Sequence, residues 1–235
     1  MNKVKQHTII ILLAFTNFLS FAQTDSTKFI RYTPDFKFAD GIYLSFEQVQ
    51  GNNPIPASRI VTSENINSHN FYDKIFNEDN LVLFDENGMK LEIEKSEVWG
   101  YCKLGAIYIQ YNDDFYRIPV IGSIAHFVGQ ELVENYRGYD PYNRYYDPNY
   151  YNLGGHRNTI TTKELRQYLL DFSSGRVLLY NRKSLKVMLM PDAELYEEYN
   201  NLRRRKQKKM LFFYVRRFNE RNPLMMPVYK SNIPK

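Results

Sequence analysis

The fold of this chain is decided in residues 81–128, which read as short strands joined by tight turns. An Asn-Gly pair accepts the positive φ angles of a two-residue hairpin turn. The run after the turn alternates apolar and charged residues, the pattern of a half-buried strand. We therefore predict a β-hairpin at the start of the stretch, which reads Leu81-Val82-Leu83-Phe84, Asp85-Glu86-Asn87-Gly88, Met89-Lys90-Leu91-Glu92-Ile93.

The same pattern continues to the end of the stretch. Strands are expected at residues 98–101, 106–111 and 115–118, with turns between them. An earlier strand follows Asp40-Gly41, and a later hairpin covers residues 165–180. We predict one antiparallel β-meander sheet within a β-rich domain of residues 40–190.

A long helix is predicted over residues 191–222. Asp192 is a good N-cap residue, and a stripe that includes Leu195, Tyr199 and Phe213 follows the helical period. Acidic residues near its start and arginines near its end complement the helix dipole. The fold class predicted is α+β, an antiparallel β-meander sheet packed by a long C-terminal α-helix.

Residues 1–22 have the three parts of a signal peptide. Lys3 and Lys5 precede an apolar run, and Ser20-Phe21-Ala22 supplies small residues at the cleavage positions. The alternative is an uncleaved anchor, but the run is short for a membrane span. We expect an exported protein, periplasmic or extracellular, with an extended arm at 23–39, a tail at 223–235 and no transmembrane segment after cleavage.

The net charge sets a weak bias. The chain carries +5, and without Lys3 and Lys5 it carries +3. Nucleic acid is therefore not the partner we expect.

Several stretches resemble uncharacterised secreted proteins of Bacteroidota. They include Val98-Trp99-Gly100-Tyr101, the run from Phe115 to Phe127, and Asp40-Gly41-Ile42-Tyr43-Leu44-Ser45-Phe46. The resemblance covers most of the chain after residue 22. It implies export but no established activity, so no catalytic residue is transferred from it.

A Tyr-rich loop is predicted at residues 134–158, where Asp-Pro pairs interrupt a segment without apolar period. Tyr with Asn and Arg is a composition typical of recognition surfaces, and an unknown protein or glycan is the expected partner. The alternative is a loop of low order, or one folded onto the domain by its own tyrosines. The candidate partner-binding residues are Tyr139, Tyr142, Arg144, Tyr145, Tyr146, Tyr150 and Tyr151.

A basic run at residues 203–209 is the strongest local charge. Behind a signal peptide, phospholipid or lipopolysaccharide head groups are the nearest anions, and residues 210–215 are expected to make apolar contact with such a surface. The alternative is a solvated helix face. The candidate anion-binding residues are Arg203, Arg204, Arg205, Lys206, Lys208 and Lys209.

No catalytic constellation stands out. Cys102 is the only cysteine and is expected to be buried, and His126 is expected to be an ordinary strand residue. The sequence has no helical pair of histidines at metal-ligand spacing, so we expect neither a metal site nor a cofactor. The leading hypothesis is an exported, non-catalytic protein that binds a partner through the Tyr-rich loop. The second is a binder of anionic lipid or lipopolysaccharide through the basic helix, and the third is a hydrolase whose site is not located.

Overall fold

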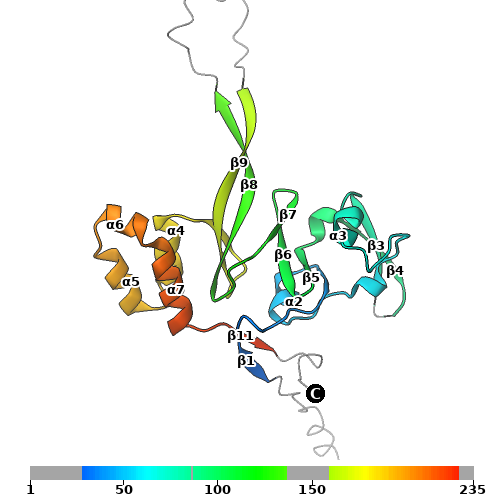
Figure 1. Ribbon diagram of the computed structural model, residues 1–235, viewed down its shortest axis with the longest axis horizontal. Coiled ribbons are helices and arrows are strands. Elements are labelled where there is room, and N and C mark those ends of the chain that lie inside the picture. Colours follow the sequence, from blue (N-terminus) through cyan, green and yellow to red (C-terminus); the bar gives the residue numbers. More distant parts are fainter. Residues whose placement is uncertain (1–27, 86, 137–158, 228–235) are drawn as a thin grey trace, which may run out of the picture.

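The computed structural model describes residues 28–85, 87–136 and 159–227, and Figure 1 shows their arrangement. The α+β class is confirmed. The strands are β1 (Phe29–Arg31), β2 (Gly41–Tyr43), β3 (Asn80–Phe84), β4 (Lys90–Glu94), β5 (Gly100–Lys103), β6 (Ala106–Tyr111), β7 (Asp114–Arg117), β8 (Ile124–Tyr136), β9 (Thr159–Asp171), β10 (Val177–Leu179) and β11 (Met225–Pro227). The helices are α2 (Phe46–Gln50), α3 (Phe71–Ile75), α4 (Arg182–Leu189), α5 (Ala193–Asn200), α6 (Arg204–Lys209) and α7 (Leu211–Arg221), with 3₁₀ turns at Ala57–Arg59 and Lys95–Glu97.

The predicted meander is present in the sheet ordered β2-β5-β6-β7, where all neighbours are antiparallel. Two-residue turns join its hairpins. Leu104 and Gly105 connect β5 to β6, and Asn112 and Asp113 connect β6 to β7, all with positive φ. Paired positive φ angles give the turn the twist of the flanking strands, which fixes their register.

The prediction of a single sheet is wrong, because three separate sheets share these residues. β3 and β4 form a hairpin of their own, and β8, β9 and β10 form a third sheet. The hairpin turn between β3 and β4 is also longer than predicted. Asp85 N–H donates to Met89 O across it at 2.8 Å, and residues 85–89 separate the two strands. An apolar alternation marks a strand but does not say which neighbour it pairs with.

The sheets and helices are arranged in layers, as Figure 1 shows from right to left. The β3–β4 hairpin and α3 cover one face of the β2-β5-β6-β7 sheet, through buried residues such as Phe71, Leu83 and Tyr101. The other face packs on the β8-β9-β10 sheet through residues such as Ile107 and Phe127. The helices α4, α5 and α7 cover the far side of that third sheet, around Ile124 and Leu169.

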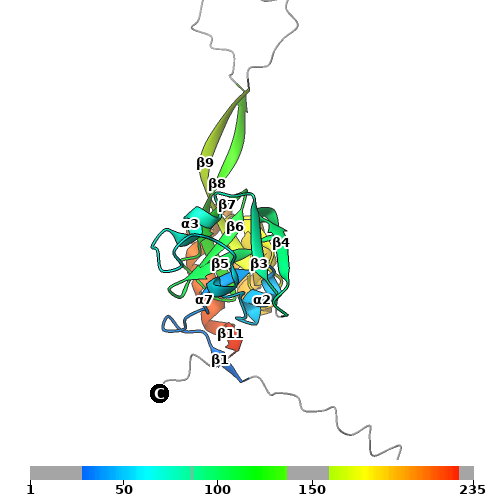
Figure 2. The same cartoon turned by 90° about the vertical axis from the view of Figure 1, so that its right-hand side faces the viewer.

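The third sheet contains a ribbon that projects beyond the layers. β8 and β9 pair over their whole length, from Ile124 opposite Asp171 to Tyr136 opposite Thr159. Figures 1 and 2 show this ribbon rising away from the body in both views. The start of the predicted Tyr-rich loop is therefore wrong, since residues 134–136 belong to β8, and residues 137–158 of that prediction lie outside the described residues. The hairpin predicted at 165–180 is confirmed in β9 and β10.

The predicted arm and tail are wrong in the part that the structure describes. β1 pairs with β11, from Phe29 opposite Pro227 to Arg31 opposite Met225. Phe36, Phe38 and Met226 are buried in the core between the two larger sheets. These short segments carry no periodic signal, because three residues are too few to show an alternation.

The single long helix is also wrong, because the chain forms three helices there. Asp192 caps α5 as predicted and accepts a hydrogen bond from Leu195 N–H at 3.1 Å. The chain leaves the helix after Asn200, and Arg203 has extended backbone angles. Gln207 then folds back, and its Nε2 donates to Tyr199 O at 2.9 Å and to Asn200 O at 3.2 Å. The amide donates to two carbonyls at the C-terminal end of α5, one of which, Tyr199 O, also accepts from Leu202 N–H at 3.2 Å, and these hydrogen bonds stabilise the break.

α7 is fixed to the third sheet by a polar contact. Asn219 Oδ1 accepts from Ile124 N–H, and its Nδ2 donates to Ile124 O, both at 2.8 Å. A Cβ on Gly122 would lie 2.4 Å from Asn219 Nδ2, so the close approach requires glycine. This contact holds α7, and with it α6, at a fixed place beside the sheet.

Candidate anion-binding site

The six predicted cations of the basic run all lie on exposed positions, at Arg203 and along α6. The buried position of this helix is taken by Gln207, which is 2% exposed, whereas Lys206 is exposed. A buried amide can satisfy its donors and acceptor with backbone groups, whereas a buried ammonium requires an acid. The run therefore presents its positive charge to solvent.

Among the residues that the structure describes, none of these cations forms an ion pair with an acid, and every ion pair involves other residues. The contrast with α7 is direct. Arg217 Nη1 lies 2.5 Å from Glu198 Oε1, and Arg221 Nε lies 2.7 Å from Asp192 Oδ2. The hydrogen bond to Glu198 raises the pKa of Arg217, and the one from Arg217 lowers the pKa of Glu198. The charge of α7 is thus neutralised within the fold, and that of α6 is not.

α4 adds further cations beside α6, across a hollow of about 360 Å³. Sequence reasoning missed this contribution, because Arg182, Lys183 and Lys186 do not form a contiguous run. Asn181 begins α4 by accepting from Lys183 N–H at 2.8 Å and Ser184 N–H at 3.0 Å, which sets the direction of the helix. The residues that line the hollow are Arg182, Lys183, Lys186, Asn200, Leu202, Arg204 and Gln207.

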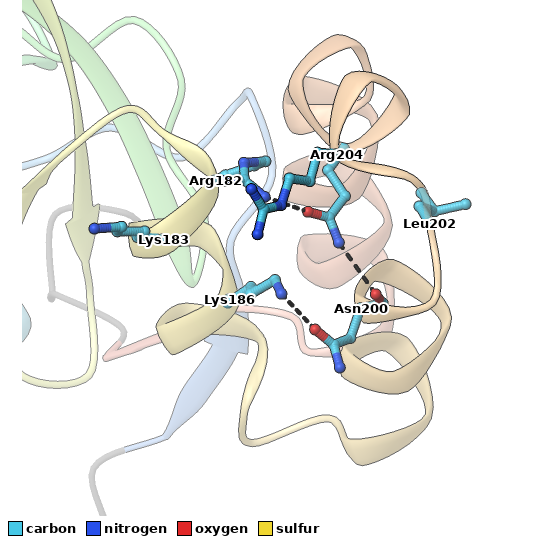
Figure 3. Close-up of a pocket in the computed structure, with 7 residues that line it drawn as sticks. Arg182, Lys183, Lys186, Asn200, Leu202 and Arg204 are labelled. Atoms are coloured by element: carbon cyan, nitrogen blue, oxygen red, sulfur yellow. Dashed lines mark hydrogen bonds between the residues drawn. The ribbon is translucent and has the colours of Figure 1, made fainter.

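Two of these cations are oriented by neutral partners. Arg182 Nη1 donates to Gln207 Oε1 at 3.0 Å, and Lys186 Nζ donates to Asn200 Oδ1. Figure 3 shows Arg182, Lys186 and Arg204 reaching into the space between α4 and α6, while Lys183 points away. An amide orients a cation without removing its charge, so the hollow is positive and partly pre-organised.

The predicted apolar contact next to α6 is only partly available. Leu211, Tyr214 and Val215 are buried in the helical layer, so they do not reach a surface. Phe212 and Phe213 are 41% and 46% exposed. They are the side chains of this segment that remain for contact with a membrane interface.

The other predicted site residues are placed as follows. The candidate residues of the Tyr-rich loop, from Tyr139 to Tyr151, lie outside the described residues. Cys102 is fully buried, and burial raises the pKa of its thiol, with Asp40 adding to the effect. His126 shares a hydrogen bond with Gln167 Oε1 at 2.9 Å, as expected for a strand residue.

Within the described part of the chain, no group of His, Cys, Asp and Glu side chains is arranged to hold a metal ion. Over the same residues, none of the helices has the length and apolar character needed to span a bilayer. No family model, curated protein or solved structure matches the chain. The site is therefore interpreted from its own geometry.

Proposed function

We propose that this chain is an exported, non-catalytic protein that binds an anionic surface of the cell envelope through α4 and α6. The observation that carries the proposal is that the cations of these two helices have no acid partner among the described residues. Solvated charges of one sign on a single face raise the local concentration of a polyanion. Each Lys or Arg near an anionic membrane contributes about 1 kcal/mol of attraction.

The exposed rings beside α6 support a lipid surface over a soluble polyanion. Phe212 and Phe213 directly follow the basic helix and are about half exposed. Aromatic rings next to cations are typical of segments that lie in a membrane interface. Export supports the same assignment, since the envelope lipids are then the nearest anions.

The test is binding of the chain from residue 23 onward to vesicles of phosphatidylglycerol and phosphatidylcholine against phosphatidylcholine alone. We expect binding to the anionic vesicles only, weakening as salt is added because salt screens exposed charges. Replacing Arg203, Arg205 and Lys208 together by Gln should weaken binding about a hundredfold, since three contacts of about 1 kcal/mol are lost.

A matched control removes the same charge elsewhere. Lys90, Lys103 and Arg117 lie in β4, β5 and β7, away from the helical layer, and their replacement by Gln leaves binding nearly unchanged if the α6 surface is the site. Equal losses in the two triple variants would mean that net charge alone drives binding, and the proposal would then be wrong. Absence of binding to the anionic vesicles at low salt would also reject it.

A second candidate function is partner binding by the Tyr-rich segment. The observation that favours it is that residues 137–158 connect the ends of the projecting β8–β9 ribbon. The described end of the ribbon, Tyr136 opposite Thr159, lies away from the body in both views. Deleting residues 137–158 should leave vesicle binding intact and remove capture of that partner.

A further inference from the structure

The hollow between α4 and α6 differs in kind from the open face of α6. Of its lining residues, Arg182, Lys183, Lys186 and Arg204 are cations, and none is an acid. Gln207, at its inner wall, is 2% exposed. A concave site holds an anion on several sides, whereas a flat charged face attracts anions without selecting among them.

The chemistry of the lining limits the ligand. Leu202 is the one apolar residue among those that line the hollow, so the wall does not suit an acyl chain. Guanidinium groups bind phosphate or carboxylate oxygens through paired N–H donors. A volume of about 360 Å³ also leaves space beyond a single phosphate for the polar group that carries it.

The number of inward cations favours one kind of phosphate. Arg182, Lys186 and Arg204 reach into the space from two helices (Figure 3). A phosphate monoester has three terminal oxygens and a charge of about −1.5 to −2 at neutral pH. A phosphodiester offers two such oxygens and a single charge, so it neutralises less of the charge of these three cations.

We propose that the hollow is a binding site for a phosphate monoester carried on a polar body such as glycerol or a sugar. The terminal oxygens are bound by Arg182 and Lys186 from α4 and by Arg204 from α6. Gln207 orients Arg182. The monoester can belong to a lipid head group or to a free phosphorylated metabolite. If the monoester is a lipid head group, the site rests on the proposed function, and it makes the chain select monoester lipids among the anionic lipids of the envelope.

The test compares vesicles containing phosphatidic acid, a monoester, with vesicles containing phosphatidylglycerol, a diester, at matched surface charge. We expect the chain to bind the monoester vesicles about tenfold more tightly, as one additional charge-assisted contact would give. Arg182→Gln should abolish this preference, and it should weaken binding to phosphatidylglycerol by no more than about fivefold, the loss of one surface charge. Arg216→Gln, on exposed α7 surface, is the control and should keep the preference.

A free ligand separates the two sources of the monoester. Calorimetric titration with glycerol phosphate should show binding that Arg182→Gln weakens about tenfold to a hundredfold. Inorganic sulfate at the same ionic strength should compete poorly, because it lacks the polar body. Binding of phosphatidic acid vesicles without binding of glycerol phosphate would assign the site to the lipid head group, and binding of both would assign it to the shared monoester.

Arg182→Lys tests whether Arg182→Gln loses the preference only because the variant is less stable. It keeps the charge but loses the fork of donors, so it should retain the unfolding midpoint and lose most of the preference. If Arg182→Gln changes the unfolding midpoint, the exposed Arg204→Gln takes its place.

The outcomes distinguish this inference from the proposed function. Equal binding of monoester and diester vesicles, unchanged by Arg182→Gln, would overturn the hollow as a site and leave surface binding by α6 standing. Binding of glycerol phosphate by a chain that binds no vesicle would overturn the surface function and leave the hollow standing.

Discussion

The cations of α7 and those of α6 lie on consecutive helices and differ in what faces them. Arg217 and Arg221 each contact acids of α5 or its cap, at 2.5 and 2.7 Å. The six cations at 203–206, 208 and 209 have no such contact among the described residues. Paired arginines hold one helix against another, whereas unpaired ones are available to a ligand. The comparison therefore makes a prediction for each group: loss of a paired charge changes stability, and loss of an unpaired one changes binding.

Asp192→Ala should have the largest effect on stability. The change removes the N-cap of α5 and one of the two acids that hold Arg221, and about 2 kcal/mol of the free energy of unfolding should be lost. Urea unfolding measures this loss, and vesicle binding should stay unchanged. Asp192→Asn is the matched control, since Asn caps helices well, and it should recover about half of the loss. Unaltered stability in the Ala variant would contradict a structural role for this pair.

Acid should lower the stability that comes from the ion pairs between α5 and α7. The cations of α6, which have no acid partner among the described residues, should not be affected. Burial acts to raise the pKa of Asp192, but hydrogen bonds from Leu195 N–H and Arg221 outweigh it and lower the pKa. The hydrogen bond from Arg217 lowers the pKa of Glu198. Groups with a lowered pKa stabilise the fold at pH values above their unfolded pKa, and this contribution is lost as the pH falls through the folded pKa.

Stability should therefore decline below about pH 4, and less steeply in Asp192→Asn. Urea midpoints across acid pH give the comparison. A parallel decline in wild type and variant would mean that other carboxylates control acid unfolding.

Glu198→Gln leaves Arg217 without its acid partner. The variant therefore tests whether an unpaired arginine binds vesicles wherever it lies, or only on α4 and α6. Glu198 accepts from Arg217 and from Tyr214 Oη at 2.9 Å, and its loss as an acid should cost about 1 kcal/mol of the unfolding free energy. Vesicle binding should change less than about twofold, because Arg217 stays held over the rings of Phe213 and Tyr214 when the acid is lost. A marked gain in binding would show that any unpaired arginine suffices.

Arg216→Gln should have the smallest effect. Arg216 and Glu220 form an exposed pair with 3.9 Å between Nη2 and Oε1, and such pairs contribute about 0.5 kcal/mol or less. Both the urea midpoint and vesicle binding should stay near the wild-type values. A large loss of binding here would extend the binding surface onto α7 and weaken the comparison.

The parts of the fold that depend on local signals could be predicted from sequence. The turns at Leu104-Gly105 and Asn112-Asp113, the cap at Asp192 and the α+β class all follow from residues near one another in the chain. The pairing of β1 with β11 and the division into separate sheets could not, because both depend on contacts between distant segments. The break after Asn200 was missed for the same reason, since it depends on the side chain of Gln207.

The candidate site also has one part that could be predicted from sequence and one that could not. The basic run was visible as consecutive residues, but the hollow was not, because Arg182 of α4 and Arg204 of α6 meet only in the folded chain. Nor does a charge run reveal whether acids face it. From the sequence, Arg182 and Arg176 look equally available to a ligand. In the structure Arg176 Nη2 lies 3.6 Å from Asp171 Oδ2, so of the two only Arg182 lacks an acid partner among the described residues.

The pairing of β1 with β11 has a consequence for how the chain reaches its fold. Strand Phe29–Arg31 has no partner until Met225–Pro227 has been synthesised, and the core around Phe36 and Phe38 is incomplete without Met226. Contacts between distant segments close large loops before they contribute any free energy, so they form late and slowly. Folding is therefore completed after translation of the described chain has ended, and a chain stopped before Met225 would leave Phe29, Phe36 and Phe38 without their closing strand.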